Sequence, residues 1–232
     1  MKTNSRIPRG FTLVELLVVI VIIAALAGLT APMIIKQARK ADAAEALSNA
    51  RQIGMAMFSF QAEYSSYPDA DTEKDVDKAG GYTLGTANSN NYFQQLFAAG
   101  MCESEAMFFA KVKDSRKPDG NITGAEALAA GECGFGYVLD TADGLTASGN
   151  PSRILAACPL LAASATEFDI DPFDKKAILL RIDNSVTSAP IVDKKAMSST
   201  KADAVDLFEG KDKDTIWGAD ITPTIIPPSP VS

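Results

Sequence analysis

The stretch Arg9-Gly10-Phe11-Thr12-Leu13-Val14-Glu15 opens an apolar run that lasts to Ile35 and decides the fold of this chain. From Leu16 to Leu29 no side chain is polar. A helix over the 20 residues 16–35 rises 1.5 Å per residue and matches the hydrocarbon core of a bilayer, about 30 Å thick. Glu15 puts a carboxylate at the start of this span. An acid in hydrocarbon costs about 2.5–3.5 kcal/mol on insertion scales, which indicates a functional role and a partner.

Two simpler explanations of the apolar run have to be weighed. Lys2, Arg6 and Arg9 precede it, and the positive-inside rule keeps such a segment cytoplasmic. A removed signal peptide has an apolar core of about 7–15 residues followed by a small-residue cleavage site. Here the core is longer, and the A-x-A match Ala25-Leu26-Ala27 lies inside it. The other explanation is a permanent anchor with no further role.

The stretch Arg9–Glu15 resembles the prepilin signature of type IV pilins and type II secretion pseudopilins. In that signature a basic leader ending in Gly precedes Phe-Thr-Leu-Val-Glu. The resemblance implies that a prepilin peptidase/N-methyltransferase cuts the Gly10–Phe11 bond and methylates the new N-terminus at Phe11. It also implies that Glu15 pairs with the N-terminal ammonium of a neighbouring subunit. The alternative for Glu15 is a helix-initiating residue at the membrane interface.

Pro32 and Gly28 interrupt the apolar helix near its end. Pro32 removes the hydrogen bond to the carbonyl of Gly28 and predicts a kink, and Gly28 weakens the same turn by about 1 kcal/mol relative to Ala. The resemblance implies an assembly role, in which this turn extends as subunits pack. A passive kink is the alternative.

The helix is predicted to continue to Tyr64, because residues 36–64 contain no Pro and one Gly. An i, i+4, i+7 spacing defines one apolar face of this second half. That face comprises Ala43, Leu47, Ala50, Ile53, Met57, Phe60 and Tyr64. We therefore expect a leader over 1–10, a transmembrane and assembly helix over 11–35, an amphipathic helix over 36–64, and a head over 65–232 with a Pro-rich C-terminal tail.

The head is predicted to have an α+β fold that packs on the long helix and contains an antiparallel sheet. Short helices are expected over 91–99, 103–111 and 124–130, and strands over 136–139, 177–182 and 189–192. Residues 183–186 favour a hairpin turn between the last two strands. The tail from Ile221 contains four prolines, so its last part is expected to lack regular structure.

Two acidic loops are weak candidates for calcium. Asp69, Asp71, Glu73, Asp75 and Asp77 alternate after the helix, but Lys74 stands where an EF-hand requires Gly and no closing Glu follows. Residues 169–174 are the second candidate. We interpret both as solvated loops and expect no cofactor and no metal site, with calcium as the alternative.

Composition limits the function further. The chain from residue 11 has 19 Lys and Arg against 29 Asp and Glu, which argues against nucleic acid as a partner. Histidine is absent and no phosphate-binding Gly-rich loop is present, so we predict no catalytic residues and no enzyme. Cys102, Cys133 and Cys158 permit one disulfide of undetermined pairing, or buried free thiols.

Together these observations predict a structural subunit, a pilin or pseudopilin. The resemblance implies an inner-membrane, single-pass precursor whose head lies outside the cytoplasm. Its implied partners are the peptidase, neighbouring pilin copies, the assembly platform and the lipid bilayer. The mature subunit would then join a cell-surface filament or a periplasmic pseudopilus. The rival hypothesis is a membrane-anchored binding or adhesion module that does not polymerise.

Overall fold

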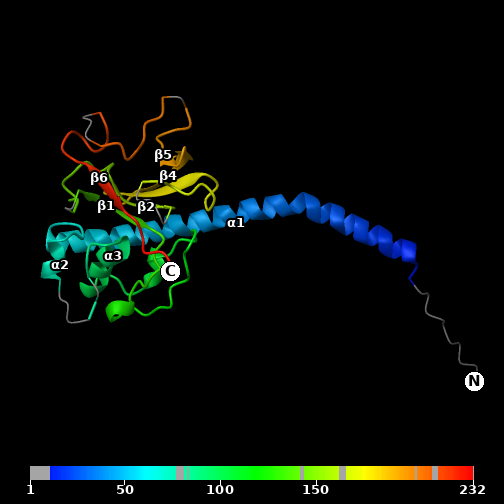
Figure 1. The fold of residues 1–232 in the computed structure, drawn as a ribbon, viewed down its shortest axis with the longest axis horizontal. Coiled ribbons are helices and arrows are strands. Elements are labelled where there is room, and N and C mark those ends of the chain that lie inside the picture. Colours follow the sequence, from blue (N-terminus) through cyan, green and yellow to red (C-terminus); the bar gives the residue numbers. More distant parts are fainter. Residues whose placement is uncertain are drawn as a thin grey trace, which may run out of the picture. The chain divides into compact units, whose positions relative to one another are not determined.

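The computed structural model describes residues 11–76, 81–82, 84–141, 144–161, 166–201, 203–210 and 214–231. The leader, including Gly10, lies outside the described residues. Residues 39–232 form one compact unit, the head with the second half of the long helix, and the apolar half of that helix belongs to the other unit (Figure 1). The fold is α+β, as predicted.

Helix α1 runs from Leu13 to Tyr64 without interruption, and Pro32 lies inside it. Its second half buries the predicted apolar face, since Ala50, Ile53, Met57 and Phe60 are buried. The outer members of that face, Ala43, Leu47 and Tyr64, pack partly buried against the same core. The helix ends where Ser65 adopts a positive φ of 65°. The long amphipathic helix is therefore confirmed in its type and its length.

Six strands form one antiparallel sheet in the order β5-β4-β3-β2-β1-β6 among the described residues. Their bounds are Gly136–Asp140 (β1), Ile154–Cys158 (β2), Lys176–Arg181 (β3), Val186–Val192 (β4), Lys195–Ala196 (β5) and Pro223–Ile226 (β6). The hairpin β3–β4 was expected, and its register pairs Leu180 with Val186 across the predicted turn. Strands β2, β5 and β6 were not predicted.

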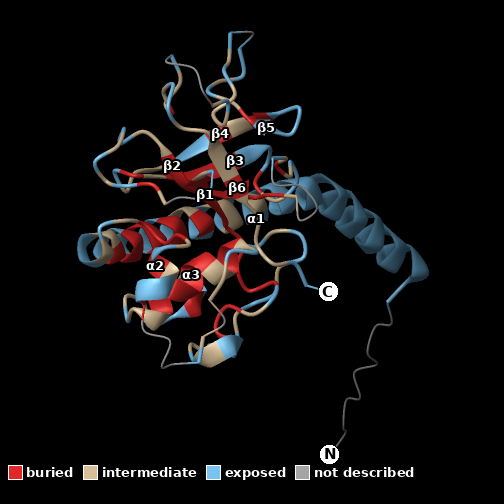
Figure 2. Ribbon diagram, turned by 60° about the vertical axis from the view of Figure 1, so that its left-hand side comes forward, coloured by how far each residue is buried: buried red, intermediate tan, exposed pale blue. Residues whose placement is uncertain are grey.

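The head packs in layers around the second half of α1. The sheet lies on one side of this half, and α3 (Ser89–Ala98) with the segment that follows it lies on the other, as both views of the molecule show (Figures 1 and 2). Aromatic rings link the layers, with Phe93 of α3 centred 5.5 Å from Tyr137 of β1. Buried residues concentrate at these contacts, and the apolar half of α1 is exposed throughout.

Two predicted helices are wrong in extent. The stretch 103–111 forms only the 3-10 turn η2, Glu105–Phe108, and the stretch 124–130 only η3, Gly124–Glu126. After η2 the chain extends at Phe109, with ψ 132°, and Ala110 packs against the backbone of Gly134. Leu128 has a positive φ of 48°, which a helix cannot include. Tertiary contacts override local propensity in both places.

The C-terminal tail is more ordered than its prolines suggest. Pro223 begins β6, an edge strand, where a missing N–H is tolerated. Beyond β6 no strand follows in the described residues, but backbone hydrogen bonds hold the tail against the head. The N–H of Ser89 donates to the carbonyl of Pro227 at 2.9 Å, and the N–H of Gly131 to that of Ser229 at 2.8 Å. The tail therefore closes one side of the head.

Candidate functional site

The first helical turn of α1 is held by a capping box formed by Thr12 and Glu15. Oε2 of Glu15 accepts hydrogen bonds from the N–H of Thr12 at 2.9 Å and from its hydroxyl at 2.7 Å. In return the N–H of Glu15 donates to Oγ1 of Thr12 at 3.3 Å. This is the reciprocal arrangement that starts helices in the pattern Ser/Thr-x-x-Glu. The sequence Thr12-Leu13-Val14-Glu15 fits that pattern, so the capping box could have been predicted from the sequence but was not.

The capping box leaves part of the Glu15 carboxylate unused. Both bonds from Thr12 use Oε2, and Oε1 has no hydrogen-bond partner among residues 11–76 or the rest of the described chain. Glu15 is exposed on the single chain, as is Phe11. One carboxylate can therefore both initiate the helix and accept a cation from outside the chain.

Gly28 and Pro32 lie far along the same helix and do not converge with Glu15. Gly28 follows Glu15 by 13 positions, which correspond to about 20 Å of helix. A Cβ at Gly28 would meet nothing within 4 Å, so the single chain gives this glycine no packing role. Near Pro32 the hydroxyl of Thr30 bonds back to the carbonyl of Leu26 at 3.0 Å, a contact that often bends helices. The assembly roles of both residues stay predictions.

Every residue in the apolar half of α1, from Leu13 to Ile35, is exposed on the isolated chain. Its large side chains range from 80% exposed at Leu13 to 44% exposed at Val19. Among the described residues, α1 is the one helix long and apolar enough to cross a membrane. A helix that is apolar on all sides requires lipid or other apolar helices around it.

Residues 6–31 match the family model for the prokaryotic N-terminal methylation motif. No curated protein and no solved structure matches the chain. The chain carries the type IV pilin and pseudopilin signature. The match covers the leader end, Phe11, Glu15 and Gly28, and stops one residue before Pro32. The motif indicates a structural subunit rather than an enzyme, and with the exposed apolar helix it fits a membrane-anchored, single-pass protein.

Asp69 is a structural anchor, and its interpretation as part of a solvated loop is wrong. It is buried, and its Oδ1 accepts from the N–H groups of Asp71 at 2.8 Å and Thr72 at 2.7 Å. Its Oδ2 accepts from the hydroxyl of Ser66 and the N–H of Gly144. Burial alone would raise the pKa of Asp69, but these hydrogen bonds outweigh it and lower the pKa.

The calcium alternative fits this loop poorly. Four protein donors already occupy both oxygens of Asp69, which leaves it ill-suited to ligate a cation. Asp71 is exposed and pairs with Lys74, and Asp77 lies outside the described residues. In the second loop Asp169 accepts from the N–H of Asp171 at 3.0 Å. Calcium in either loop stays an untested alternative.

The head gathers carboxylates at a place that sequence reasoning missed. Oxygens of Glu105, Asp119 and Glu132 lie within 4.8 Å of one another, and the two glutamates are fully buried. Burial raises the pKa of Glu105 although its oxygens accept from the N–H groups of Leu128 and Gly120. Glu132 pairs with Arg116 at 3.2 Å. These contacts hold the loop between η2 and β1, and no local pattern links residues so far apart in sequence.

All three cysteines are free thiols in the structure. Cys133 and Cys158 are buried, and Cys102 is partly exposed. Burial raises the pKa of Cys133 to about 12 and raises that of Cys158 well above its usual value. The thiolate is the reactive form of cysteine, so both buried groups are held in the unreactive state.

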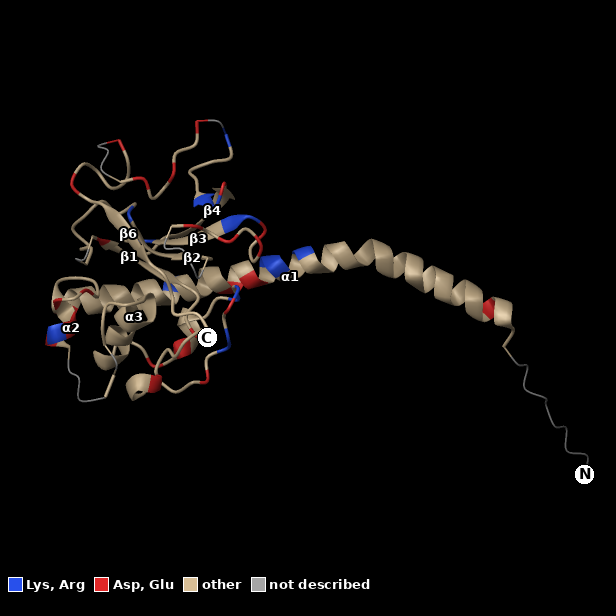
Figure 3. Cartoon of the chain, in the orientation of Figure 1, with Lys and Arg blue, Asp and Glu red and all other residues tan. Residues whose placement is uncertain are grey.

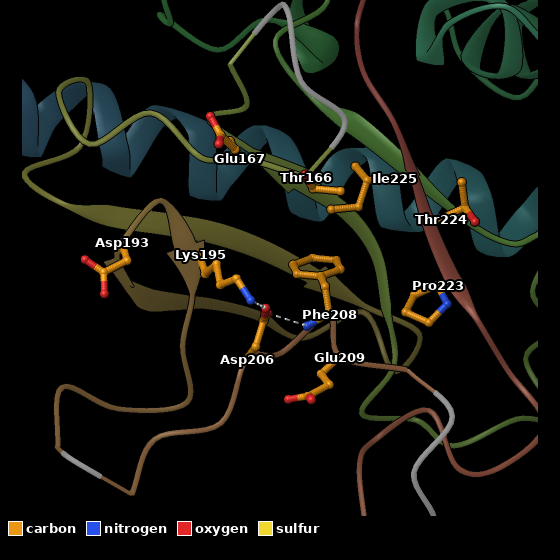
Figure 4. Close-up of a pocket in the computed structure, with 10 residues that line it drawn as sticks. All are labelled: Thr166, Glu167, Asp193, Lys195, Asp206, Phe208, Glu209, Pro223, Thr224 and Ile225. Carbon is orange, nitrogen blue, oxygen red and sulfur yellow. Dashed lines mark hydrogen bonds and ion pairs between the residues drawn. The ribbon is translucent and has the colours of Figure 1, made fainter.

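A pocket of about 570 Å³ lies between β6 and the chain that follows β5 (Figure 4). Four carboxylates line it, from Glu167, Asp193, Asp206 and Glu209. Lys195 pairs with Asp206 at 3.0 Å near the ring of Phe208. Its acids, one ion pair and one aromatic ring do not form a nucleophile–base pair.

Proposed function

We propose that this chain is a pilin or pseudopilin subunit that a prepilin peptidase cuts between Gly10 and Phe11 and that assembles through α1. The observation that carries the proposal is the methylation motif over residues 6–31, joined to a helix whose apolar half is exposed on the single chain. Cutting before the span keeps that half on the mature protein. The head then lies outside the cytoplasm, first at the inner membrane and then in a filament or pseudopilus.

The proposed role of Glu15 follows from its geometry. Cleavage creates an α-amino group on Phe11, and in the assembled state that ammonium reaches the carboxylate of an adjacent copy. Oε1 of Glu15 has no partner among the described residues, so the ammonium can bind without breaking the bonds from Thr12. In hydrocarbon, an unpaired carboxylate and an unpaired ammonium are each costly, and removing one partner of a buried pair costs about 3–5 kcal/mol. The ion pair between the Phe11 ammonium of one copy and Glu15 of the next therefore favours the one register of neighbouring helices in which both charges are paired.

Two substitutions separate capping from assembly. Glu15→Gln keeps an amide oxygen that accepts from Thr12, and Gln serves in capping boxes, but it removes the charge. Thr12→Val keeps the carboxylate and removes the hydroxyl cap. We expect Glu15→Gln to insert into the membrane and to lose incorporation into filaments, and Thr12→Val to retain incorporation.

Shear fractions and electron microscopy of cells that express each variant provide the readout. If Glu15→Gln formed normal filaments and Thr12→Val formed none, the role of Glu15 would be to cap the helix and not to pair with a neighbouring subunit. The hypothesis of a non-polymerising membrane anchor would then be favoured.

A further inference from the structure

The head contains a sequence pattern that the proposed function does not use. Asn121-Ile122-Thr123 is the one Asn-x-Ser/Thr triplet of the chain whose middle residue is not proline. Such triplets are the acceptors of N-linked glycans and are expected on surface loops of secreted proteins. A second triplet, Asn150-Pro151-Ser152, has proline in the middle and lies outside the pattern. Triplets also occur by chance, so the structure around them decides.

The triplet lies at the end of an irregular loop, residues 109–123, that connects η2 to η3. The loop begins beside α1, where Nζ of Lys111 lies 3.2 Å from Oδ2 of Asp42. Charged residues of both signs follow this part of the head, on the side of α1 opposite the sheet (Figure 3). Asn121 and Thr123 are exposed, and Ile122 between them is half-buried. The two side chains that define the triplet are therefore accessible from solvent.

Contacts to the head hold the backbone on both sides of Asn121. The N–H of Gly120 donates to Oε2 of the buried Glu105 at 2.9 Å, and the hydroxyl of Tyr82 donates to the carbonyl of Ile122 at 3.0 Å. Gly120 has a φ of 85°, in the left-handed region that favours glycine. The fold thus fixes the loop on either side of Asn121 and leaves its side chain exposed.

The side-chain amide of Asn121 is engaged through its oxygen only. Oδ1 accepts from the hydroxyl of Thr123 at 2.9 Å and from the N–H of Thr123 at 3.3 Å. Within the described residues, Nδ2 of Asn121 donates no hydrogen bond. In the second triplet, by contrast, Nδ2 of Asn150 donates to the carbonyl of Ile216 at 3.1 Å. The nitrogen that receives a glycan is therefore free at Asn121 and engaged at Asn150.

We propose that Asn121 accepts an N-linked glycan, transferred by a membrane oligosaccharyltransferase from a lipid-linked oligosaccharide diphosphate. C1 of the first sugar forms a bond with Nδ2, and the bond from C1 to the diphosphate oxygen breaks. The electron pair of the broken bond leaves with the lipid diphosphate, and one amide proton passes to a base of the transferase. Thr123 is the second recognition element, because the pattern requires a hydroxyl two residues after the asparagine.

This proposal rests on the proposed function, because it requires a head outside the cytoplasm, tethered by α1 to the membrane that carries the donor lipid. It also limits how subunits pack. An N-linked glycan is bulky and belongs at a surface, so the triplet at the end of loop 109–123 has to face solvent in an assembled filament. Contacts between neighbouring heads then use other faces.

The test expresses the full-length chain in bacteria together with a membrane oligosaccharyltransferase and a lipid-linked oligosaccharide of known mass. Protein from the membrane fraction is digested after glutamate and its peptides are measured by mass spectrometry. Glu126 and Glu132 lie between the two triplets, so Asn121 and Asn150 fall on different peptides. We expect the added mass of one glycan on the Asn121 peptide and no added mass on the Asn150 peptide.

Three variants separate the acceptor from a merely structural turn. Asn121→Asp keeps an oxygen that accepts from Thr123 but has no amide nitrogen, so it should carry no glycan. Thr123→Val removes the hydroxyl and should also lose the glycan. Thr123→Ser keeps the hydroxyl and should retain it.

Three results would overturn the proposal. They are a chain cut at Gly10–Phe11 that carries no glycan, a glycan that persists in Asn121→Asp, and equal modification of Asn150. An intact leader would instead count against the proposed function. The purified full-length chain, incubated in detergent with the same transferase and donor lipid, tests the acceptor without export. Transfer to Asn121 there would support the site, and no transfer to the chain while a control acceptor peptide is modified would contradict it.

Discussion

The side chain of Asn184 lies directly on Gly54 and joins the β3–β4 turn to the buried face of α1. A Cβ on residue 54 would overlap the Asn184 amide and would lie 2.8 Å from Cδ1 of Leu180. Gly costs a helix interior about 1 kcal/mol relative to Ala. The glycine is therefore explained by the close approach of the turn, and Asn184 supports that turn with a positive φ of 60°.

The head should fold without the apolar half of α1. Residues 39–232 form a compact unit with their own core, and the exposed apolar side chains of residues 13–35 are not part of that core. A fragment that starts at Lys36 is expected to be soluble, with mixed helix and strand content by circular dichroism and one cooperative unfolding transition. An insoluble or unfolded fragment would show that the core depends on the apolar half.

In that fragment, Gly54→Ala should destabilise the head by about 1–2 kcal/mol. Overpacking costs about 1–3 kcal/mol, and the better helix propensity of Ala recovers part of it. Urea unfolding measures the change in free energy. Ser48→Ala, on the exposed face of the same helix, is the control and should change stability by less than about 0.5 kcal/mol. A Gly54→Ala head as stable as the unmodified one would contradict the close packing.

Asp69→Asn should destabilise the head at neutral pH by about 1–3 kcal/mol, because an amide nitrogen cannot accept the hydrogen bonds that the second carboxylate oxygen receives. The pKa of Asp69 is lowered in the folded head, so its contribution is complete above the ordinary pKa of 3.8 and is lost as the pH falls through the lower folded value. The difference between variant and unmodified head should therefore shrink below about pH 3.8.

Thermal unfolding across pH measures that difference. Asp71→Asn is the matched control, because Asp71 is exposed and its ion pair with Lys74 is on the surface. It should change stability by less than about 1 kcal/mol at every pH. An equal effect of both substitutions would show that Asp69 is no anchor.

The three thiols should all be titratable. In denaturant without reductant, we expect three reactive thiols per chain, because the structure contains no disulfide among Cys102, Cys133 and Cys158. In the native head, Cys133 and Cys158 should react very slowly, since both are buried and their pKa values are raised. Mass analysis of the alkylated chain counts the thiols. One reactive thiol instead of three would establish a disulfide in the native protein.

The long helix could be predicted because its signals are periodic and local. Alanine-rich, proline-free sequence with apolar residues at helical spacing predicted α1 to its last residue, Tyr64. The hairpin strands β3 and β4 were predicted from the apolar runs 177–182 and 189–192 around a turn, but β4 begins three residues earlier than predicted, at Val186. Strand β2 was missed because Ile154–Cys158 is fully buried in the sheet and shows no alternation.

The remaining misses depend on distant contacts. The buried carboxylate of Glu105 accepts hydrogen bonds from the N–H groups of Gly120 and Leu128. Local sequence does not show these distant contacts, and the expected helix over 103–111 forms only a short 3-10 turn. Pro223 is typical of a residue that interrupts a strand, but at the first position of an edge strand its missing N–H leaves no ladder hydrogen bond unmade. In the candidate site, the motif identified Glu15, but its pairing with Thr12 depends on the helix start and was overlooked. Local sequence could not place the basic loop at Lys111 beside α1.

The measurement that tests the account most directly is the mass and N-terminal sequence of the protein recovered from membranes. We expect a mature chain that begins at Phe11, carries one methyl group on its α-amino nitrogen, and remains in the membrane fraction until detergent is added. Replacing Gly10 by a large residue should leave the precursor uncut, since a side chain there blocks close approach of the peptidase. A mature chain that begins beyond Ala27, or an unprocessed chain with an intact leader, would contradict the account.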